Sequence, residues 1–461
     1  MFDKGAMPVV PTGLISGEVS GYNYFFNPLG HKGVVVLFGD ALDVFNLCLK
    51  GYSFGDMLGF LPWASNNNER FWKIVNGLGN MELIGLGEDF DRVLRLKRRE
   101  SAKKTMTVWL QLTDACNLRC EYCCISKKPT RMGLNMAMKL VDKIVVDAGK
   151  AGFEEVFVKI AGGEPTLFWQ DAKALIDWAE PRFAASKPAV RFHIISNGTL
   201  IASSLIDYLK REKVGLSISL DGVGKWHDSQ RPFVSGCGSF EKVDSNISKL
   251  VKEGISFNIL AVVTGKSAGG LTELAQYCIS RDLPFRFGFY REKPSSICES
   301  EVENEDLIRE LKRCYSWMAD NLPDRNLQSF HKLGDVKLDG PKIRNCGIGA
   351  NSLTVGCDGS LSICQYEMEV SLGNVLECDS VETMRGQKVY DLDSTNVNKV
   401  PVCKDCEWKY NCGGGCPLLT KQHFGSMGHA FPYCSVYKAV LPVLVELFAL
   451  QMVRKFENAR K

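Results

Sequence analysis

Between Met106 and Tyr290 the chain alternates short apolar runs with longer stretches in which apolar residues recur every three or four positions. The first pattern predicts buried strands and the second predicts amphipathic helices. We expect strands over 106–113, 156–161, 191–196, 215–220, 257–263 and 284–290, and helices over 135–151, 170–184, 200–212, 239–253 and 268–282. Strand–helix units of this length predict an α/β fold with a parallel sheet, either a barrel or an open doubly wound sheet.

The N-terminal region has a different pattern. Residues 1–20 are rich in Gly and Pro and predict an irregular start, and apolar runs at 22–26 and 34–37 predict two strands around an Asn27–Gly30 turn. Helices are expected from Asp40, around Met57, and over 69–78, before a closing strand at 82–84. Two strands, helices and a final strand indicate a winged-helix-like module within residues 1–95.

After the strand–helix region, which we bound at 105–292, the periodicity weakens. Residues 293–345 predict a mixed connection, residues 346–436 are rich in Cys and Gly with little helical pattern, and a last helix is expected within 436–461. The basic run from Leu94 to Lys104 predicts a linker or the end of a solvated charged helix. The most apolar stretch, 439–453, contains Pro442 and Glu446 and is shorter than the ~20 residues that span a bilayer, so no membrane segment is predicted.

Composition narrows the class. The chain has 461 residues, 45% of them hydrophobic and 24% charged, which is typical of a soluble globular protein with several domains. A net charge of +3 is too small to favour nucleic acid as a partner. No secretory signal is visible, so a cytoplasmic location is expected. The 18 cysteines are the exception, because clustered thiols that stay reduced in the cytosol bind metals.

Cys116, Cys120 and Cys123 lie on one loop directly after the first predicted strand of the alternating region. Three thiolates can bind three irons of a cubane cluster and leave the fourth iron without a protein ligand. Redox clusters usually take four cysteines, so this set predicts an external ligand and chemistry at that iron. A zinc knuckle without its fourth ligand is the alternative. The Cys-x3-Cys-x2-Cys spacing resembles the signature of radical S-adenosylmethionine (radical SAM) enzymes.

Other segments similar to that family follow the next strands. The sequence Gly162-Gly163-Glu164-Pro165 resembles the family's GGEP segment, which implies that Gly162, Gly163 and Glu164 hold the ammonium of SAM. Asn197 follows the third strand and is expected to contact the cofactor. Ser219 ends the fourth strand and resembles the contacts to ribose and carboxylate, and Asp221 is expected either to share this role or to orient substrate.

Two further residues carry implied roles. Tyr122, inside the cysteine loop, is expected to pack near the adenine of SAM. Arg231 belongs to a His227-Asp228-x-x-Arg231 stretch similar to one in peptide-modifying members of the family. Its guanidinium can pair bidentately with the SAM carboxylate, and a structural ion pair is the alternative.

A second group of cysteines occupies the C-terminal quarter. It consists of Cys346, Cys364, Cys403, Cys406, Cys412, Cys416 and Cys434. The spacing resembles the seven-cysteine SPASM extension, which carries two auxiliary 4Fe–4S clusters. The resemblance assigns Cys346, Cys364 and Cys416 to one cluster and Cys403, Cys406, Cys412 and Cys434 to the other. Thiolates at this spacing also suit a zinc ribbon.

The three-cysteine auxiliary set lacks a fourth ligand. Asp358-Gly359 predicts a two-residue hairpin turn that pairs Cys357 with Ser360 and Leu353 with Cys364. At about 3.3 Å per residue, Cys357 then lies roughly 13 Å from Cys364, too far for one cubane. Cys378, a ligand other than cysteine, or an open site remain.

Three N-terminal segments, Asn27–Gly30, Val34–Leu37 and Ala41–Phe45, resemble the RiPP recognition element. That winged-helix fold binds leader peptides by adding a strand to a sheet edge. A packing domain without a ligand is the alternative. Together the resemblances describe a partial (β/α)6 TIM-like radical SAM barrel with an N-terminal winged-helix-like module and a C-terminal SPASM extension.

The resemblance implies a peptide maturase. Such an enzyme cleaves SAM to a 5′-deoxyadenosyl radical, takes hydrogen from a ribosomal precursor peptide and forms a thioether or carbon–carbon crosslink. It implies three 4Fe–4S clusters (one that binds SAM and two auxiliary), SAM itself, a leader–core peptide, and a reductant such as flavodoxin or ferredoxin. The alternatives are an anaerobic sulfatase-maturating enzyme, which would not need the N-terminal module, and a zinc-stabilised binding protein without catalysis.

Overall fold

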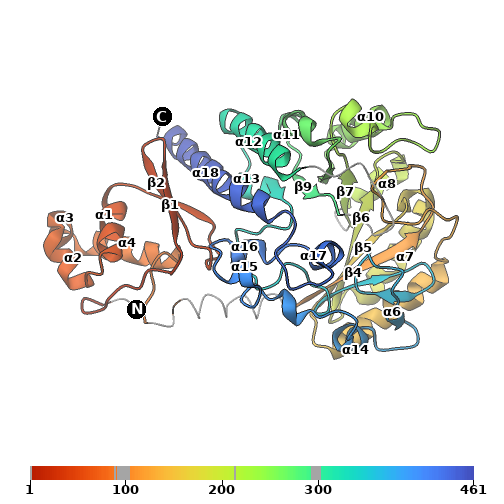
Figure 1. Cartoon of the computed structure of the whole chain (residues 1–461), viewed down its shortest axis with the longest axis horizontal. Helices are drawn as coiled ribbons and strands as arrows, with labels where there is room; N and C mark the ends of the chain where they lie inside the picture. Colours follow the sequence, from red (N-terminus) through yellow and green to blue (C-terminus); the bar gives the residue numbers. More distant parts are fainter. Residues whose placement is uncertain (1–2, 88–89, 91–103, 212–213, 292–302, 461) are drawn as a thin grey trace.

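Six parallel strands form the centre of the computed structural model, which describes residues 3–87, 90, 104–211, 214–291 and 303–460 (Figure 1). The strands are β4 (Thr105–Thr113), β5 (Glu155–Gly162), β6 (Ala189–Ser196), β7 (Val214–Ser219), β8 (Asn258–Val263) and β9 (Phe285–Phe289). The helices between them include α6 (Leu134–Lys150), α7 (Trp169–Phe183), α8 (Ser203–Leu209), α10 (Phe240–Lys252) and α11 (Leu271–Ser280). The strands and helices predicted for this region are confirmed to within a few residues.

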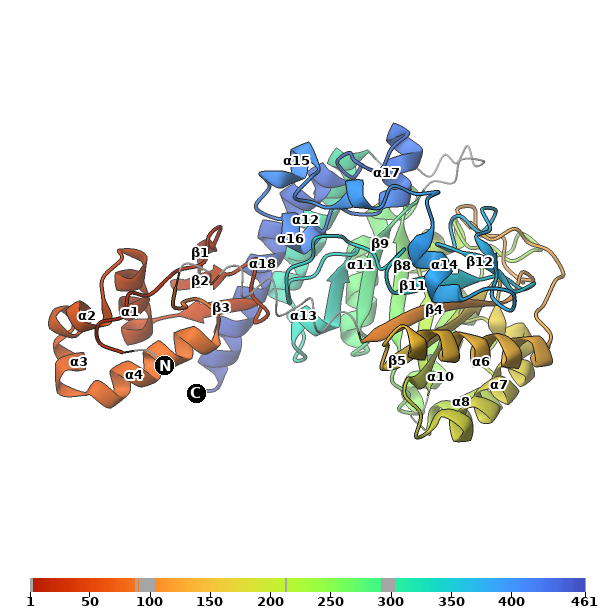
Figure 2. The same ribbon diagram turned by 90° about the horizontal axis from the view of Figure 1, so that it is seen from below.

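The sheet does not close on itself, because both edges of the six strands pair with later segments. Its order is β10-β9-β8-β7-β6-β5-β4-β11-β12-β13. The added strands are β10 (His331–Leu333), β11 (Ser352–Val355), β12 (Ser360–Ser362) and β13 (Gly373–Asn374). β11 runs parallel to β4, so the Cys-rich region is built onto the first strand of the partial barrel (Figure 2).

Alternation along the strands separates an apolar layer from a polar one. In β4 the buried Met106, Val108 and Leu110 belong to the main core, while residues between them point to the opposite face. On that inner face Lys159 of β5 stands beside His193 of β6. Burial first, then Lys159 and Arg191, lowers the pKa of His193 to about 4, so its ring is neutral at pH 7. The interior of the partial barrel is therefore polar.

The hairpin between β11 and β12 has a different register from the predicted one. Thr354 pairs with Ser362 and Val355 with Leu361, and Gly356 N–H donates to the Ser360 carbonyl at 2.9 Å. The connection is therefore three residues long, with Gly359 in the left-handed region at φ +82°. A type I turn followed by a left-handed glycine forms such loops, and the prediction of a two-residue turn was wrong by one position.

The Cys-rich region is more helical than its sequence pattern suggests. It contains α14 (Ser380–Gly386), α15 (Pro401–Lys404), α16 (Lys409–Cys412) and α17 (Pro417–Phe424). The connection before it contains α12 (Asn304–Asp320) and α13 (Leu327–Phe330). The last helix, α18 (Cys434–Asn458), is long and apolar enough to pass a test for a membrane span, but most of that apolar window is buried inside the fold. α18 packs along α12 and against the N-terminal sheet, as a core helix does.

Among the described residues the N-terminal module consists of a three-stranded antiparallel sheet and four helices. Its strands are β1 (Ile15–Val19), β2 (Tyr22–Phe26) and β3 (Val34–Leu37), and its helices are α1 (Gly39–Leu49), α2 (Phe54–Phe60), α3 (Pro62–Asn66) and α4 (Asn68–Asn80). The irregular start predicted for residues 1–20 holds for the described residues 3–14 and was wrong for Ile15–Val19, because β1 pairs with β2 through a tight turn at Ser20-Gly21. Both turn residues have positive φ, of 51° and 78°, as a type I′ hairpin requires.

The closing strand predicted at 82–84 was also wrong. Only an isolated bridge between Val9 and Gly85 forms there. Glu82 has φ +58°, its carbonyl accepts from Asn27 Nδ2 at 2.7 Å, and its carboxylate accepts from His31 N–H at 2.6 Å. These contacts bind the segment to the 27–31 turn rather than to a strand. The basic run at 94–104 lies outside the described residues except for Lys104.

The N-terminal sheet is covered on both faces. Phe25, Val35 and Leu37 pack with the four helices of the module, whereas Tyr24, Phe26 and Val34 belong to the main core. Phe26 stacks on Trp408 with ring centroids 6.1 Å apart, and Phe38 packs against Phe456 of α18 at 4.4 Å. The module is therefore fixed to the C-terminal half of the chain, as Figure 1 shows.

A buried carboxylate ties the Cys-rich region to the barrel. Asp147 of α6 is fully buried and accepts from the N–H and hydroxyl of Ser380, both at 2.9 Å, and from Lys143 Nζ at 2.7 Å. Ser380 is the first residue of α14 and is also fully buried. The two bonds from Ser380 join helices that lie 233 positions apart in sequence, while Lys143 supports Asp147 from within α6.

We predict that Asp147→Ala loosens α14 without unfolding the barrel. Removing the acceptor leaves the buried Ser380 N–H without a partner, a loss of about 2–3 kcal/mol for a bond to a charged group. Amide hydrogen exchange in α14 should accelerate about 30- to 150-fold, measured by mass spectrometry. Asp142→Ala on the same helix breaks only the exposed pair with Arg182 and is the matched control. Equal acceleration in the two variants would contradict the assignment.

Candidate functional site

The Cys116–Cys123 loop follows β4 at the carboxyl end of the barrel. Its main chain is held by residues 230–234: Arg119 N–H donates to the Pro232 carbonyl at 2.9 Å, and Glu121 N–H donates to the Gln230 carbonyl at 3.1 Å. Leu118, fully buried, forms a bridge with Phe233. The loop is therefore fixed on one side of the barrel mouth before any cofactor binds.

Each thiol of the loop lies close to a nitrogen donor from a different segment. Lys127 Nζ donates to Cys123 Sγ at 2.9 Å, Arg231 Nη1 lies 3.8 Å from Cys120 Sγ, and Asn197 Nδ2 lies 3.8 Å from Cys116 Sγ. Burial raises the pKa of Cys120 to about 11, and the Arg231 cation opposes that rise. Cations beside thiols stabilise the thiolate form that binds metal, so the donor set suits an iron–sulfur cluster.

Glu164 lies beneath the loop with no exposed surface. One carboxylate oxygen accepts from Thr166 N–H at 3.0 Å, Thr166 Oγ1 at 2.5 Å and Ser196 Oγ at 2.9 Å, while the other accepts from Asn197 N–H at 2.6 Å. Burial raises the pKa of Glu164, and these four bonds counteract that rise. The second oxygen accepts from one donor among the described residues, so it can also accept a hydrogen bond from a cationic ligand.

The two glycines before Glu164 allow β5 to approach the end of β4. A Cβ on Gly163 would lie 2.1 Å from the carbonyl oxygen of Ala115, and one on Gly162 would lie 2.2 Å from that of Thr113. Gly163 N–H and Glu164 N–H donate to those same two carbonyls, at 2.7 and 2.8 Å. No other residue fits either position, and the approach sets the carboxylate beneath the cysteine loop.

Asp221 is a positioning residue rather than a group that faces substrate. It is 1% exposed, and its oxygens accept from Val262 N–H at 2.9 Å, from Arg231 Nε at 2.7 Å and from the Tyr122 hydroxyl. The Arg231 guanidinium also lies 5.4 Å above the Tyr122 ring. The structural ion pair considered for Arg231 is present, and the pair orients both Arg231 and Tyr122 toward the loop.

Ser219 and His227 complete this part of the barrel mouth. Ser219 is half-buried and is the last residue of β7. His227 is fully buried, receives the Asp221 N–H on Nδ1 at 3.3 Å, and contacts Ser239 Oγ through Nε2 at 3.0 Å. Burial lowers the pKa of His227 to about 4, so it acts here as a neutral structural group.

The seven C-terminal cysteines show two patterns of electrostatic influence on one another. Burial raises the pKa of Cys364, and the neighbouring thiols Cys346 and Cys416 add to that rise. Burial likewise raises the pKa of Cys403, and there the contributing thiols are Cys434 and Cys406. Cys412 interacts with Cys434 and Cys403 and so belongs with the second group. These influences follow the two sets expected from the sequence, and the division of the thiols into two cluster sites stays a prediction.

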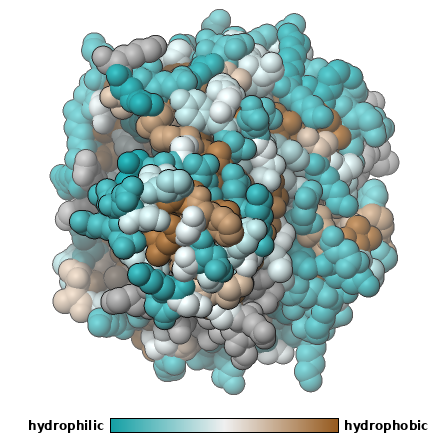
Figure 3. Space-filling model, turned by 90° about the vertical axis from the view of Figure 1, so that its left-hand side faces the viewer, coloured by the Kyte–Doolittle hydropathy of each residue, from teal (hydrophilic) through white to brown (hydrophobic). Residues whose placement is uncertain are grey.

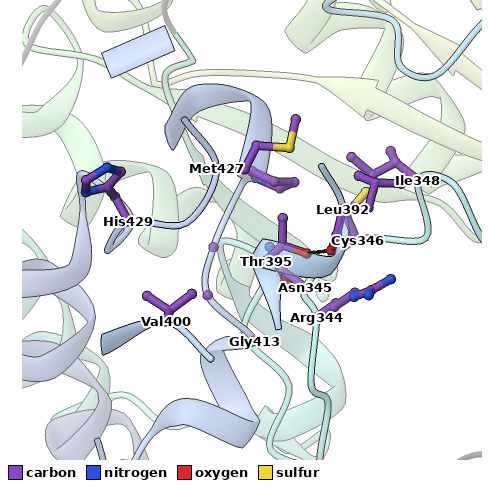
Figure 4. Close-up of a pocket in the computed structure, with 13 residues that line it drawn as sticks. Arg344, Asn345, Cys346, Ile348, Leu392, Thr395, Val400, Gly413, Met427 and His429 are labelled. Carbon is purple, nitrogen blue, oxygen red and sulfur yellow. Dashed lines mark hydrogen bonds between the residues drawn. The ribbon is translucent and has the colours of Figure 1, made fainter. Parts of the chain in front are cut away.

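Cys378, which remained a candidate for the missing ligand, and Cys357, which the predicted hairpin excluded, each contact other groups. Cys378 Sγ contacts the Asn374 carbonyl at 3.1 Å beside α6 and α14. Cys357 Sγ lies 3.2 Å from the Gln111 carbonyl and 3.6 Å from Asp114 Oδ1. Figure 4 shows His429 across a small cavity from Cys346, with Met427 between them. A ligand other than cysteine or an open position therefore remains for the three-cysteine set.

A cavity of about 570 Å³ lies between the cysteine loop and the Cys-rich region. Residues 124–131 line one side and the hairpin residues 356–370 line the other. At its base Gln111 is 4% exposed, and its Oε1 is a buried acceptor with no hydrogen-bond partner among the described residues. Gln111 Nε2 and Cys357 both approach Asp114 Oδ1. The cavity therefore presents an acceptor that a substrate donor can satisfy.

The fold and its three groups of thiols define a protein that binds iron–sulfur clusters at the mouth of a partial α/β barrel. The profile of the radical SAM superfamily matches residues 110–278, and the iron–sulfur cluster-binding SPASM profile matches residues 346–407. The chain is thus an enzyme of the radical SAM superfamily with a SPASM domain. It uses SAM and iron–sulfur clusters, and three clusters fit its architecture. These matches exclude the zinc-binding alternative.

Among similar sequences, the cysteine-type anaerobic sulfatase-maturating enzyme of Clostridium novyi is 25% identical over 344 residues, 70% of this chain and 91% of that protein. The subtilosin biosynthesis protein AlbA of Bacillus subtilis is 23% identical over 361 residues, 76% of each chain. Among solved structures, anSMEcpe with bound AdoMet and Cp18Cys peptide has a TM-score of 0.58, 21% identity, and covers 77% of this chain and 100% of its own. Streptococcus suis SuiB bound to precursor peptide SuiA has a TM-score of 0.54, 14% identity, and covers 93% of this chain and 100% of its own.

The sequence did not indicate several residues of this site. Lys127 lies four residues after Cys123. That spacing brings two side chains together in a helix, but this segment is a loop, so nothing in the sequence indicates that they pair. Gln111 and Asp114 precede the cysteine loop and look like ordinary strand-end residues. Cys357 is brought to them by the parallel pairing of β11 with β4, which no short-range pattern reveals.

We predict that Glu164→Gln weakens SAM binding about ten- to a hundredfold. The amide keeps the size but loses the negative charge of a charge-assisted bond, a loss of about 1.5–3 kcal/mol. Isothermal titration of the anaerobically reconstituted protein gives the dissociation constant. Glu154→Gln changes an exposed carboxylate just before the other end of β5 and is the matched control. An unchanged constant at position 164, with full iron content, would exclude an ammonium contact.

Proposed function

We propose that the protein is a peptide maturase that takes hydrogen from a ribosomal precursor peptide and forms a thioether or carbon–carbon crosslink in it. The observation that carries this proposal is the extent of the fold similarity. SuiB, whose structure holds a precursor peptide, matches 93% of this chain, whereas the sulfatase maturase anSMEcpe matches 77%. The larger share supports an architecture that includes a module before the barrel.

When bound, the cluster and SAM supply the hydrogen-abstracting chemistry. The chain's own residues hold these groups. Each of the three loop thiols has a nitrogen donor beside it, from Lys127, Asn197 or Arg231. The second carboxylate oxygen of Glu164 can accept a hydrogen bond from the SAM ammonium. Asp221 fixes the orientation of Arg231 and of Tyr122. Preorganised charge of this kind needs no rearrangement when the ligand arrives.

The cavity between the cysteine loop and the hairpin is the proposed binding site of the core peptide. It adjoins the cysteine loop, and both the barrel and the SPASM region contribute to its walls. Leaving a buried acceptor such as Gln111 Oε1 without a partner costs about 1–3 kcal/mol, so a peptide N–H or a side-chain donor that reaches it gains that energy. Such an acceptor orients a residue against the barrel mouth.

The N-terminal module is the proposed site for the leader part of the peptide. β3 pairs with β2 on one side only among the described strands, so its other edge offers main-chain groups to an added strand. Figure 3 shows apolar side chains gathered at this end of the molecule. Leu49 and Phe60 of the module are 49% and 56% exposed. An unpaired strand edge on a module that also exposes apolar side chains supports binding of an extended peptide.

The anaerobic sulfatase maturase remains the second candidate. Four of the similar sequences carry that name, and the one from Clostridium novyi aligns over 91% of its own length. In this alternative the substrate is a Cys or Ser residue of a sulfatase, and the N-terminal module serves packing. Either reaction fits a cytoplasmic enzyme supplied with electrons by flavodoxin or ferredoxin.

The two functions are separated by their products. The reconstituted enzyme should be incubated with SAM, a reductant and either the short peptides encoded beside its gene or the Cp18Cys peptide. A crosslink removes two hydrogens and joins two residues, which tandem mass spectrometry detects as a missing series of fragments. Formylglycine in Cp18Cys, without any change in the encoded peptides, would overturn the maturase proposal.

We predict that deleting residues 1–87 removes modification of a leader-bearing peptide but leaves SAM cleavage in the absence of peptide unchanged. The leader raises the local concentration of the core at the barrel mouth, and this gain is lost with the module. Iron, sulfide and 5′-deoxyadenosine are measured as internal controls, because the deletion exposes Phe456 and Trp408. A core peptide without its leader should react equally with both enzymes. Full-rate modification by the truncated enzyme would make the module a packing domain.

We also predict that Gln111→Leu lowers kcat/KM for the peptide about ten- to a hundredfold. The isobutyl group removes the buried acceptor, a change of about 1.5–3 kcal/mol when the lost bond orients the reacting residue. SAM affinity and cluster content should stay unchanged. Gln170→Leu, on the exposed side of α7, is the matched control. Unchanged peptide kinetics would remove the cavity from the substrate site.

A further inference from the structure

The cavity between the cysteine loop and the hairpin carries an excess of negative charge. Its lining contains four carboxylates and two cations: Asp114, Asp358, Glu367, Glu369, Lys128 and Arg131. Charges of one sign around a hollow lined by protein attract a ligand of the opposite sign. The balance of the lining groups therefore favours a cationic ligand.

Neither cation forms an ion pair with a carboxylate of the cavity within the described part of the chain. Arg131 Nη1 lies 3.5 Å from Asp171 Oδ2, and its guanidinium lies 5.2 Å above the Phe168 ring. Asp171 does not belong to the cavity lining, so the charge of Arg131 is balanced outside the cavity. Lys128 is exposed to water, and salt screens its charge.

The carboxylates contact neutral donors instead. Asp358 Oδ1 accepts from Ser360 N–H at 3.0 Å, and Glu367 Oε2 accepts from the Tyr390 hydroxyl at 3.0 Å. Asp114 accepts from uncharged side chains. None of these three carboxylates forms an ion pair in the part of the chain that the structure describes. Hydrogen bonds from neutral groups position the carboxylate oxygens but leave their charge uncompensated.

A buried acceptor at the base of the cavity is an independent sign of a ligand. Gln111 is 4% exposed, and its Oε1 has no hydrogen-bond partner among the described residues. Gln111 Nε2 donates to Asp114 Oδ1, so turning the amide over would bring two acceptors together. Oε1 therefore stays an acceptor. A ligand donor that reaches it removes the unfavourable state of a buried group without a partner.

We propose that the cavity selects a basic side chain, lysine or arginine, in the core peptide. The inference rests on the proposed function, in which this cavity binds the core. The N–H donors of the charged group contact Gln111 Oε1, and its positive charge lies among Asp114, Asp358 and Glu367. A glutamate at the same place meets charge of its own sign, and an apolar side chain leaves the acceptor without a partner, so both bind more weakly.

Photo-crosslinking of short synthetic peptides tests this preference without turnover. Four tetrapeptides, acetylated at the N-terminus and amidated at the C-terminus, carry photo-leucine beside lysine, arginine, norleucine or glutamate. The capped ends remove the terminal charges, so only the side-chain charge differs. After irradiation with the reconstituted enzyme, mass spectrometry measures labels in residues 124–131 and 356–370 as the peptide concentration rises. The lysine and arginine peptides should bind at least about fivefold more tightly than the norleucine peptide, and the glutamate peptide should bind most weakly.

Variants identify the groups responsible. The double variant Asp358→Asn, Glu367→Gln keeps the size of both side chains and should reduce the preference for the basic peptides to about twofold or less. Gln111→Leu should weaken the basic peptides and leave the norleucine peptide unchanged. High salt should also weaken the basic peptides alone, because it screens charge pairs. Glu377→Gln removes an exposed carboxylate that does not line the cavity, and is the matched control.

Equal affinity of the four peptides for the unmutated enzyme, or labels of the basic peptides outside the two segments, would overturn the proposal. So would a preference that survives in the double variant at unchanged iron content. If the double variant does not fold, the four peptides on the unmutated enzyme decide. The preference without any crosslinked product contradicts the maturase proposal alone, and a crosslinked product without the preference contradicts the selection of a basic side chain alone.

Discussion

The contact between Gly162-Gly163 and the end of β4 is the constraint on which the candidate site depends. The carbonyls of Thr113 and Ala115 occupy the space where side chains of those two residues would lie. Because the strands approach so closely, Glu164 enters the space beneath the cysteine loop, where Thr166, Ser196 and Asn197 supply its hydrogen bonds. Those donors are themselves strand-end residues. One close backbone approach therefore positions the carboxylate that is proposed to accept from the SAM ammonium.

The fold of the barrel region was predictable because its strands are buried and its helices are amphipathic. Strong periodicity survives in β4 to β9, where each apolar residue packs against the helices outside. The N-terminal module was less predictable, since β1 (sequence Ile-Ser-Gly-Glu-Val) is polar and its hairpin depends on the positive φ of Ser20 and Gly21. The expected closing strand does not form, because this segment is held by hydrogen bonds of the Asn27 and Glu82 side chains instead of by main-chain pairing with another strand.

The site was predictable to the extent that its chemistry is local in sequence. The cysteine spacings and the Gly-Gly-Glu segment each lie within a few residues, so the sequence alone indicated them. Gln111, Asp114 and Cys357 meet only because β11 pairs with β4 across more than 240 positions. A hairpin register wrong by one residue also reverses the face of every side chain on that strand. These residues could not be predicted as one group because they lie far apart in sequence.

The packing of the N-terminal module limits how a leader peptide can act. Phe26 stacks on Trp408, and Phe38 packs on Phe456, so the module shares its core with the SPASM region and α18. Moving it would expose this apolar surface at a cost of about 25 cal/mol per Å². In the proposed function, a leader bound to the module therefore gains its effect through the length of peptide between module and cavity, since effective concentration depends on whether that connection spans the two sites. The fold then favours precursor peptides in which the chain between the leader and the modified residue is long enough to connect the module with the cavity.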